Sequence, residues 1–193
     1  RMSKDPAYLA QLQDYYAEHG VFPPYSAIGQ LIGLRSKASV AAFVARMRAA
    51  GHLEATADRR LKPGSRFFER ARRGTVRAGL PQGAEEAYLD PVRLDRYLIG
   101  EPSRAVLIEV KGDSMIDAGI LPGDLAVVER ESPADSGDLV VARVDGEFTL
   151  KRLAQADGRY LLKPANPDYP DIHPTDALEI YGIVRGIVRK YAK

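Results

Sequence analysis

The first third of the chain has apolar side chains at helical spacing, in three runs that each begin with a capping residue and end at a glycine. The predicted helices run from Asp5 to Gly20, from Ser26 to Gly33 and from Ser36 to Gly51. The buried stripe of the third helix is expected to be Val40, Phe43, Val44 and Met47. Two short strands, 53–56 and 66–69, are predicted around the polar loop 57–60. Two helices joined by a tight turn and followed by a hairpin predict a winged helix-turn-helix.

Beyond residue 104 the pattern changes to short strands separated by turns. The expected strands are Ala105–Val110, Leu125–Glu129, Asp138–Val144, Phe148–Leu153, Tyr160–Lys163 and Ile183–Tyr191. Asp145-Gly146 and Asp157-Gly158 are dipeptides that favour tight hairpin turns. The second half is therefore predicted to be mostly β, and the whole chain to be an α+β protein of two domains.

Charge separates the same two halves, although the net charge of the 193 residues is only +2. Residues 1–78 hold 14 Lys and Arg against 6 Asp and Glu, whereas residues 79–193 hold 14 against 20. A basic first half is expected to meet a polyanion, and an acidic second half is not.

The composition also excludes several kinds of chemistry. With no cysteine, the chain has no disulfide, thiolate zinc site or cysteine nucleophile, and its three histidines lie far apart. We expect neither a metal nor a cofactor. No apolar run approaches the roughly 20 residues of a membrane span and no signal-peptide pattern is present, so we expect no membrane partner and a cytoplasmic location.

The third predicted helix and the hairpin loop form a candidate interface with double-stranded DNA. The expected contact residues are Arg35, Ser36, Lys37, Ala38, Ser39, Ala41, Ala42 and Arg46 around the helix, and Arg59 and Arg60 in the loop. Basic side chains would neutralise phosphates, and alanines can meet thymine methyl groups. Since few of these side chains can read bases by paired hydrogen bonds, DNA shape is expected to share the readout. The alternative is a small helical bundle with a solvated basic face.

Residues 70–86 lose all periodicity and contain three glycines and one proline. This composition is typical of an exposed connector. It divides the chain into domains at 1–69 and 87–193.

Ser114 lies just after Gly112 at the end of a predicted strand, where a hydroxyl group is easily exposed. The backbone N–H groups of Asp113 and Ser114 are candidates for an oxyanion site. Since no histidine is well placed, a lysine whose pKa is lowered by burial is the alternative base. Lys151 alternates with Arg152 along a predicted strand, so one of the two must face apolar neighbours. From these residues alone, an ordinary turn serine and a solvated lysine remain open.

Several segments together resemble the Ser/Lys self-cleaving family of LexA repressors and UmuD proteins. They are Gly112-Asp113-Ser114-Met115, Pro122-Gly123-Asp124-Leu125, residues 144–153 around Lys151, and Ala78-Gly79, which is similar to the family's cleavage site. Ser114 and Lys151 are 37 positions apart, and Ala78 lies 36 positions before the serine. Residues 23–54 resemble the LexA DNA-binding domain, so the resemblance covers nearly the whole chain.

The resemblance implies a repressor of the DNA-damage (SOS) response that binds operator DNA as a homodimer. It implies a second domain of the LexA and signal-peptidase type, which cuts the Ala78-Gly79 bond when a RecA filament on single-stranded DNA binds as a co-protease. Ser114 would be the nucleophile and Lys151 the base, and Val76 would fill a small apolar pocket. The implied location is the nucleoid of a bacterial cytoplasm.

Two departures keep other functions open. The alanine-rich helix lacks the polar residues of the best-known LexA proteins, and the second half is at least as similar to UmuD. The alternatives are a UmuD-like accessory of a translesion polymerase and a phage-type self-cleaving repressor. A signal-peptidase-like enzyme acting in trans and a DNA-binding regulator without cleavage are two further classes.

Overall fold

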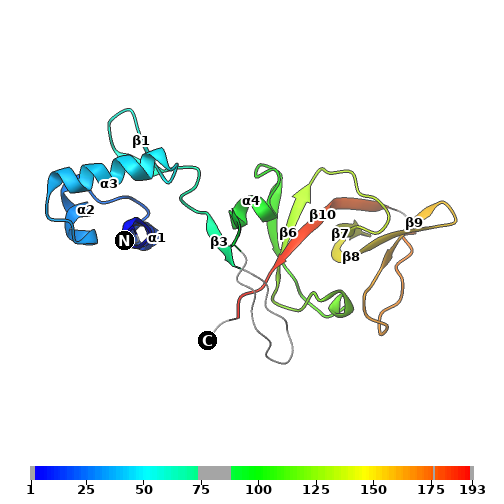
Figure 1. Cartoon of the computed structure of the whole chain (residues 1–193). Coiled ribbons are helices and arrows are strands. Elements are labelled where there is room, and N and C mark those ends of the chain that lie inside the picture. The colour runs from blue at the N-terminus through cyan, green and yellow to red at the C-terminus, as the bar shows by residue number, and fades with distance from the viewer. Residues whose placement is uncertain (1–2, 74–87, 176, 192–193) are drawn as a thin grey trace, which may run out of the picture. The chain divides into compact units, whose positions relative to one another are not determined.

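The structure, a computed structural model, divides the chain into two compact units, Arg1–Leu94 and Asp95–Lys193 (Figure 1). The structure describes residues 3–73, 88–175 and 177–191. Helices make up most of the first unit and strands most of the second. This confirms the predicted α+β class, whereas the predicted domain limits 1–69 and 87–193 stay a prediction.

Three helices enclose the core of the first unit: α1 (Asp5–His19), α2 (Tyr25–Ile32) and α3 (Lys37–Ala49). The core residues are Leu12, Ile28, Ile32, Val40, Phe43, Val44, Met47, Leu53 and Phe67. The predicted stripe of the third helix is therefore confirmed. Gly29 is required where α2 meets the turn before α3, because a Cβ atom there would lie 2.7 Å from the carbonyl oxygen of Leu34.

One of the three predicted N-cap residues is confirmed. Ser36 caps α3, with its hydroxyl accepting a hydrogen bond from Ser39 N–H at 3.0 Å. The prediction for Ser26 was wrong, because α2 already begins at Tyr25 after Pro24. Asp5 is the first residue of α1 rather than its cap, and its carboxylate binds Arg46 instead.

Behind α3, strand β1 (Leu53–Ala55) pairs antiparallel with β2 (Leu61–Pro63). The second strand predicted at 66–69 was wrong. These residues form a turn in which Arg66 N–H donates to Gly51 O, and the aromatic ring of Phe67 is buried in the core. The first residues of the predicted connector form β3 (Arg70–Arg73), which pairs with β4 (Tyr88–Val92). Strand β3 has no apolar alternation, which is why the sequence pattern missed it.

The second unit is built on one antiparallel sheet of six strands in the order β5-β6-β10-β7-β8-β9 (Figure 1). Its strands are β5 (Ala105–Glu109), β6 (Leu125–Arg130), β7 (Leu139–Val144), β8 (Glu147–Ala156), β9 (Arg159–Lys163) and β10 (Leu178–Val188). Two short helices accompany it, α4 (Leu94–Leu98) and η1 (Ile116–Ala118). All six predicted strands are confirmed, although the last one begins and ends earlier than expected.

Both predicted hairpin turns are present in this sheet. Asp145 and Gly146 have φ angles of 49° and 90°, and Asp157 and Gly158 have 52° and 76°. Two successive residues with positive φ make the turn that suits the right-handed twist of paired strands. These turns fix the register of β8 against β7 and β9. They thereby determine which residue of β7 lies opposite Lys151.

Candidate active site and DNA-binding surface

Ser114 and Lys151 meet in the second unit. The Lys151 side chain comes from the middle of β8, and its Nζ lies 2.8 Å from Ser114 Oγ, so the two groups are hydrogen-bonded. Ser114 lies in the turn before η1, next to the buried side chain of Met115. The structure thus brings together the two predicted catalytic residues.

The lysine has two further hydrogen-bond partners, which the sequence did not identify. Its Nζ donates to Thr149 Oγ1 at 2.8 Å and to the Leu150 carbonyl oxygen at 3.0 Å. Since Thr149 precedes Lys151 by two positions on one strand face, the alternation of β8 contained this signal. A neutral amine has two N–H bonds and one lone pair, so it can donate to Thr149 and Leu150 and accept from the serine hydroxyl. The same three partners also accommodate an ammonium group.

Burial lowers the pKa of Lys151. Only 7% of Lys151 is exposed, and its cross-strand partner is the fully buried Val140. The neighbouring Arg152 is exposed, which settles which of the two basic residues faces the apolar side. Desolvation disfavours the charged amine and lowers the pKa of Lys151 below its usual value of 10.5.

The backbone around Ser114 has unused donors. Ser114 O accepts from Ala165 N–H at 2.8 Å, and Asp113 O accepts from Ile116 N–H at 3.1 Å. Among the hydrogen bonds of the described residues, none uses the N–H of Asp113 or Ser114, the two groups predicted for an oxyanion site. Residues 165–169 donate hydrogen bonds to Asp113 and Ser114, and this segment carried no signal in the sequence.

The predicted cleavage site and its flanking apolar residue cannot be placed against this geometry. Val76, Ala78 and Gly79 all lie outside the described residues. Their roles remain predictions.

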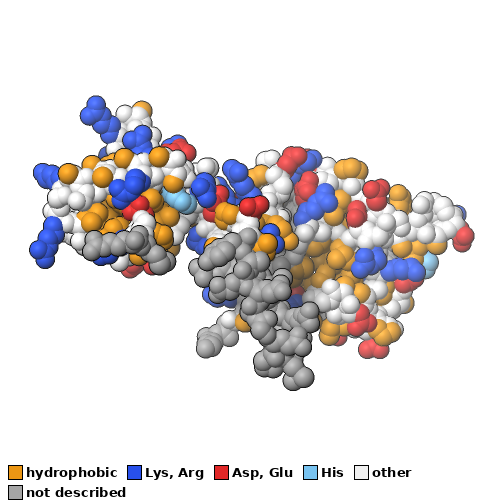
Figure 2. Space-filling view, in the orientation of Figure 1, with side chains coloured by type: hydrophobic (Ala, Val, Ile, Leu, Met, Phe, Trp, Pro, Cys, Tyr) orange, Lys and Arg blue, Asp and Glu red, His pale blue; other side chains and the backbone are white. Residues whose placement is uncertain are grey.

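The predicted DNA contacts in the first unit gather at the start of α3, where most of them are exposed. The exposed residues are Arg35, Ser36, Lys37, Ala38, Ser39, Ala41 and Ala42. Several of them also line a groove with α2, to which Tyr25, Ser26 and Gln30 contribute. Figure 2 shows Lys and Arg side chains projecting from the surface of this unit.

Arg46 differs from the other predicted contacts because it is already engaged. Its guanidinium forms two hydrogen bonds of 2.7 Å with the carboxylate of Asp5, which links α3 to α1. This pair lowers the pKa of Asp5, mainly through the hydrogen bonds from Arg46.

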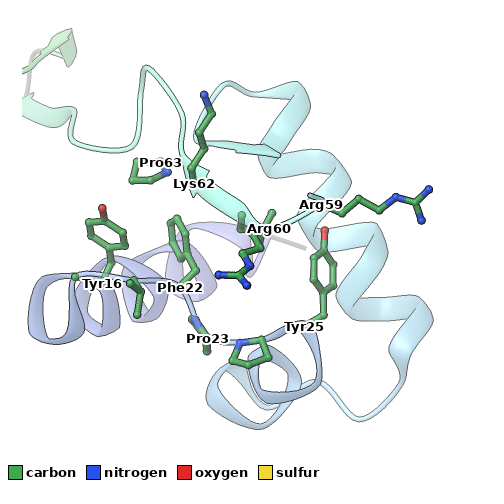
Figure 3. Close-up of a pocket in the computed structure, with 12 residues that line it drawn as sticks. Tyr16, Phe22, Pro23, Tyr25, Arg59, Arg60, Lys62 and Pro63 are labelled. Atoms are coloured by element: carbon green, nitrogen blue, oxygen red, sulfur yellow. The ribbon is translucent and has the colours of Figure 1, made fainter. Parts of the chain in front are cut away.

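The hairpin places Arg59 and Arg60 in different directions. Figure 3 shows Arg59 pointing away from the cleft between the hairpin and the α1–α2 turn, and Arg60 pointing over it toward Pro23. Arg60 pairs with Asp58 at 3.0 Å, whereas Arg59 has no ion-pair partner among the described residues. The cleft is lined by Tyr16, Phe22 and Tyr25 and has a volume of about 610 Å³.

The described part of the chain has neither a metal-binding cluster nor a membrane-spanning helix. No group of three His, Cys, Asp or Glu side chains there is placed to hold a metal ion. No helix within the described ranges is both long enough and apolar enough to cross a membrane.

Comparison with known proteins assigns the chain to a family. Residues 72–185 match the family described as Peptidase S24-like. LexA repressor 2 of Pseudomonas putida is 34% identical over 190 residues, covering 93% of both chains. LexA repressor 1 of Xanthomonas campestris is 38% identical over 197 residues, covering 97% of this chain and 96% of its own, and the LexA repressor of Opitutus terrae is 36% identical over 192 residues, covering 96% of both. The predicted resemblance is confirmed: with a peptidase S24-like domain and relatives that match along nearly its whole length, this chain belongs to the LexA repressor family.

Proposed function

We propose that this chain represses DNA-damage response genes and inactivates itself by cutting its own Ala78-Gly79 peptide bond. The observation that supports this proposal best is the 2.8 Å hydrogen bond from Lys151 Nζ to Ser114 Oγ, formed by a buried lysine. A serine needs a base to become a nucleophile, and a lysine acts as one only where its neutral form is favoured. Ser114 has a candidate base within hydrogen-bond distance, and burial of that lysine lowers its pKa, which increases the share of its neutral form.

In the proposed reaction, neutral Lys151 takes the proton of Ser114 Oγ as that oxygen attacks the carbonyl carbon of Ala78. Backbone N–H groups near Ser114 stabilise the negative charge on the former carbonyl oxygen. The C–N bond to Gly79 then breaks, and Lys151 passes its proton to the leaving amine. Water, deprotonated by the same lysine, hydrolyses the Ser114 ester and restores the hydroxyl.

The first unit would be the part that binds DNA. Helices α2 and α3, the tight turn between them and the β1–β2 hairpin match the element order of a winged helix-turn-helix. We propose that α3 enters the major groove of an operator, that the chain binds as a homodimer, and that the hairpin meets the flanking backbone. Cutting between the two halves would then turn two linked DNA contacts into independent weak ones.

The substrate bond is tethered to the enzyme, so its effective concentration is high and cleavage must be restrained by conformation and by lysine protonation. We propose that a RecA filament on single-stranded DNA acts as the co-protease that relieves this restraint, at the bacterial nucleoid.

The experiment that tests the proposal is incubation of the purified protein at about pH 10, where more of a lysine with a lowered pKa is neutral than at pH 7. Mass spectrometry should find one fragment ending at Ala78 and another beginning at Gly79. Ser114→Ala and Lys151→Met should stay intact under the same conditions. An uncut wild-type protein, or equal cutting of Ser114→Ala, would show that this function is wrong.

A further inference from the structure

Residues 165–169, here called the brace segment, hold the turn that carries Ser114. Besides the bond from Ala165 N–H to Ser114 O, the Asn166 side chain donates from Nδ2 to Asp113 O at 3.2 Å. Tyr169 Oη donates to Asp113 Oδ1 at 2.5 Å. The brace segment therefore contacts both residues of the peptide group that precedes the nucleophile.

The amide of Asn166 has a defined orientation. Its Oδ1 accepts a hydrogen bond from Asp168 N–H at 3.0 Å, which leaves Nδ2 to donate to the Asp113 carbonyl. The opposite orientation would place an acceptor against a carbonyl oxygen and a donor against an N–H group. Asn166 is only 9% exposed, so the contact is shielded from competing water.

The geometry of a peptide group connects this contact to the chemistry. The carbonyl of Asp113 and the N–H of Ser114 belong to one planar unit and point in opposite directions. Asn166 Nδ2 and Ile116 N–H both bind the carbonyl side, while the Ser114 N–H is used by no hydrogen bond of the described residues. Fixing the carbonyl therefore fixes the direction in which the N–H is offered.

We propose that Asn166, assisted by Tyr169, is a positioning residue that orients the Asp113–Ser114 peptide so that the Ser114 N–H stabilises the oxyanion of the cleavage reaction. This inference rests on the proposed self-cleavage by Ser114 and Lys151. Donors that are aligned before the reaction need no reorganisation during it, and that is the source of their effect on rate. Asn166 touches no reacting atom and acts only through the peptide that it holds.

Two substitutions separate this role from support of the turn itself. Asn166→Asp keeps the oxygen that accepts from Asp168 N–H and replaces the donor to Asp113 by a second oxygen, whereas Asn166→Ala loses both contacts. If the donor orients the oxyanion site, both variants should cleave themselves about tenfold or more slowly at alkaline pH, a fraction of the loss seen when an oxyanion donor is removed outright. If Asn166 only shapes the turn, Asn166→Asp should cleave like the wild type.

The pH profile supplies a second readout, because no hydrogen bond of the described residues joins Asn166 to Lys151. Asn166→Ala should lower the plateau rate and leave the midpoint of the profile unchanged, whereas Thr149→Val, which removes a partner of Lys151, should move the midpoint. Thermal unfolding must show that each variant is folded at the assay temperature. A wild-type rate in both Asn166 variants, or in Asn166→Asp alone, would overturn the proposal.

A milder substitution decides the matter if both Asn166 variants unfold. Tyr169→Phe removes one exposed hydroxyl and should slow cleavage about threefold with an unchanged midpoint, as expected for a partial loss of donor alignment. An unchanged rate would then overturn the proposal. Wild-type protein in the same assay separates the two hypotheses: if it is not cut, or if Ser114→Ala is cut equally, it is the self-cleavage that fails.

Discussion

Arg189 and Asp124 form a bidentate ion pair that ties the end of the last strand to the loop following Ser114. The Arg189 Nε and Nη2 atoms lie 2.6 Å from the two carboxylate oxygens of Asp124. Arg189 also donates to Gly119 O at 2.8 Å, and Leu121 N–H donates to the carboxylate. Because Asp124 is only 1% exposed, its carboxylate is shielded from water, and the ion pair holds the loop against the end of β10.

This ion pair should make stability depend on acid pH. The hydrogen bonds from Arg189 and Leu121 lower the pKa of Asp124 from 3.8 to about 2. A carboxyl whose pKa is lower in the folded state contributes stability above its unfolded pKa and loses it as the pH falls. The melting temperature should therefore fall as the pH is lowered from about 4 to about 2. At pH 7 the ion pair should contribute its full stabilisation to the folded state.

Asp124→Asn tests this effect, because it keeps the side-chain size and removes the charge. The variant should melt several degrees lower than the wild type at pH 7, and its melting temperature should fall less steeply between about pH 4 and pH 2. Asp135→Asn, at an exposed position, is a matched control. Parallel pH curves for Asp124→Asn and the wild type would contradict the prediction.

The rate of self-cleavage should rise with pH as Lys151 loses its proton. Because burial lowers the pKa of Lys151, the rate should reach half of its plateau below pH 10.5, the usual lysine value. Lys151→Arg, which cannot become a neutral base, should reduce the plateau rate by about a hundredfold or more. Quantifying intact chain by gel densitometry between pH 7 and pH 11 gives the profile. A rate that keeps rising through pH 11 without a plateau would argue against a lysine of lowered pKa.

Thr149→Val should move this profile, because it removes one of the three hydrogen-bond partners of Lys151 at nearly constant volume. An ammonium group loses more from a missing acceptor than a neutral amine does, so the pKa should fall further and the midpoint should shift to lower pH. The plateau rate should also fall because the amine is held less firmly. A midpoint equal to that of the wild type would mean that Thr149 has no influence on the base.

Much of this fold follows from patterns within one element, and the exceptions depend on contacts between elements. The helical stripe of α3, the cap at Ser36 and the two Asp-Gly turns each involve residues a few positions apart, and all were predicted correctly. Asp5 looked like a cap in sequence, but Arg46, 41 positions away, binds its carboxylate. No local pattern contains that information.

The same difference applies to the candidate site. Ser114 and Lys151 were predicted because a family pattern connects them, and the geometry agrees. Asn166 lies in a segment without periodicity, and its link to Asp113 spans 53 positions. Arg189 stands in a basic tail in the sequence, whereas the fold turns it inward onto Asp124.

The basic residues near α3 should differ in their contribution to DNA binding. Arg35 and Lys37 are exposed and have no ion-pair partner within the described ranges, so both are available to phosphates. Arg35→Ala and Lys37→Ala should weaken binding to every duplex and reduce the salt slope by about one each. Arg46→Ala should leave the slope unchanged, because Asp5 already holds that guanidinium.

Binding isotherms at several salt concentrations, on a duplex selected by the wild-type protein from a random pool, measure these slopes. A lower slope for Arg46→Ala would mean that DNA displaces Asp5.

In the β1–β2 hairpin, Arg59 should contribute to DNA binding and Arg60 should not. The Thr56 hydroxyl donates to Asp58 and accepts from Arg60 N–H at 3.0 Å, and Asp58 in turn pairs with the Arg60 side chain. This network fixes the loop and leaves Arg59 at its apex with a φ angle of 63°. Arg59→Asn removes the charge with a residue that tolerates this backbone conformation, and it should weaken DNA binding and lower the salt slope. Arg59→Lys keeps the charge and should retain most of the affinity. Equal affinities for Arg59→Asn and Arg59→Lys would show that the hairpin tip does not reach the DNA backbone.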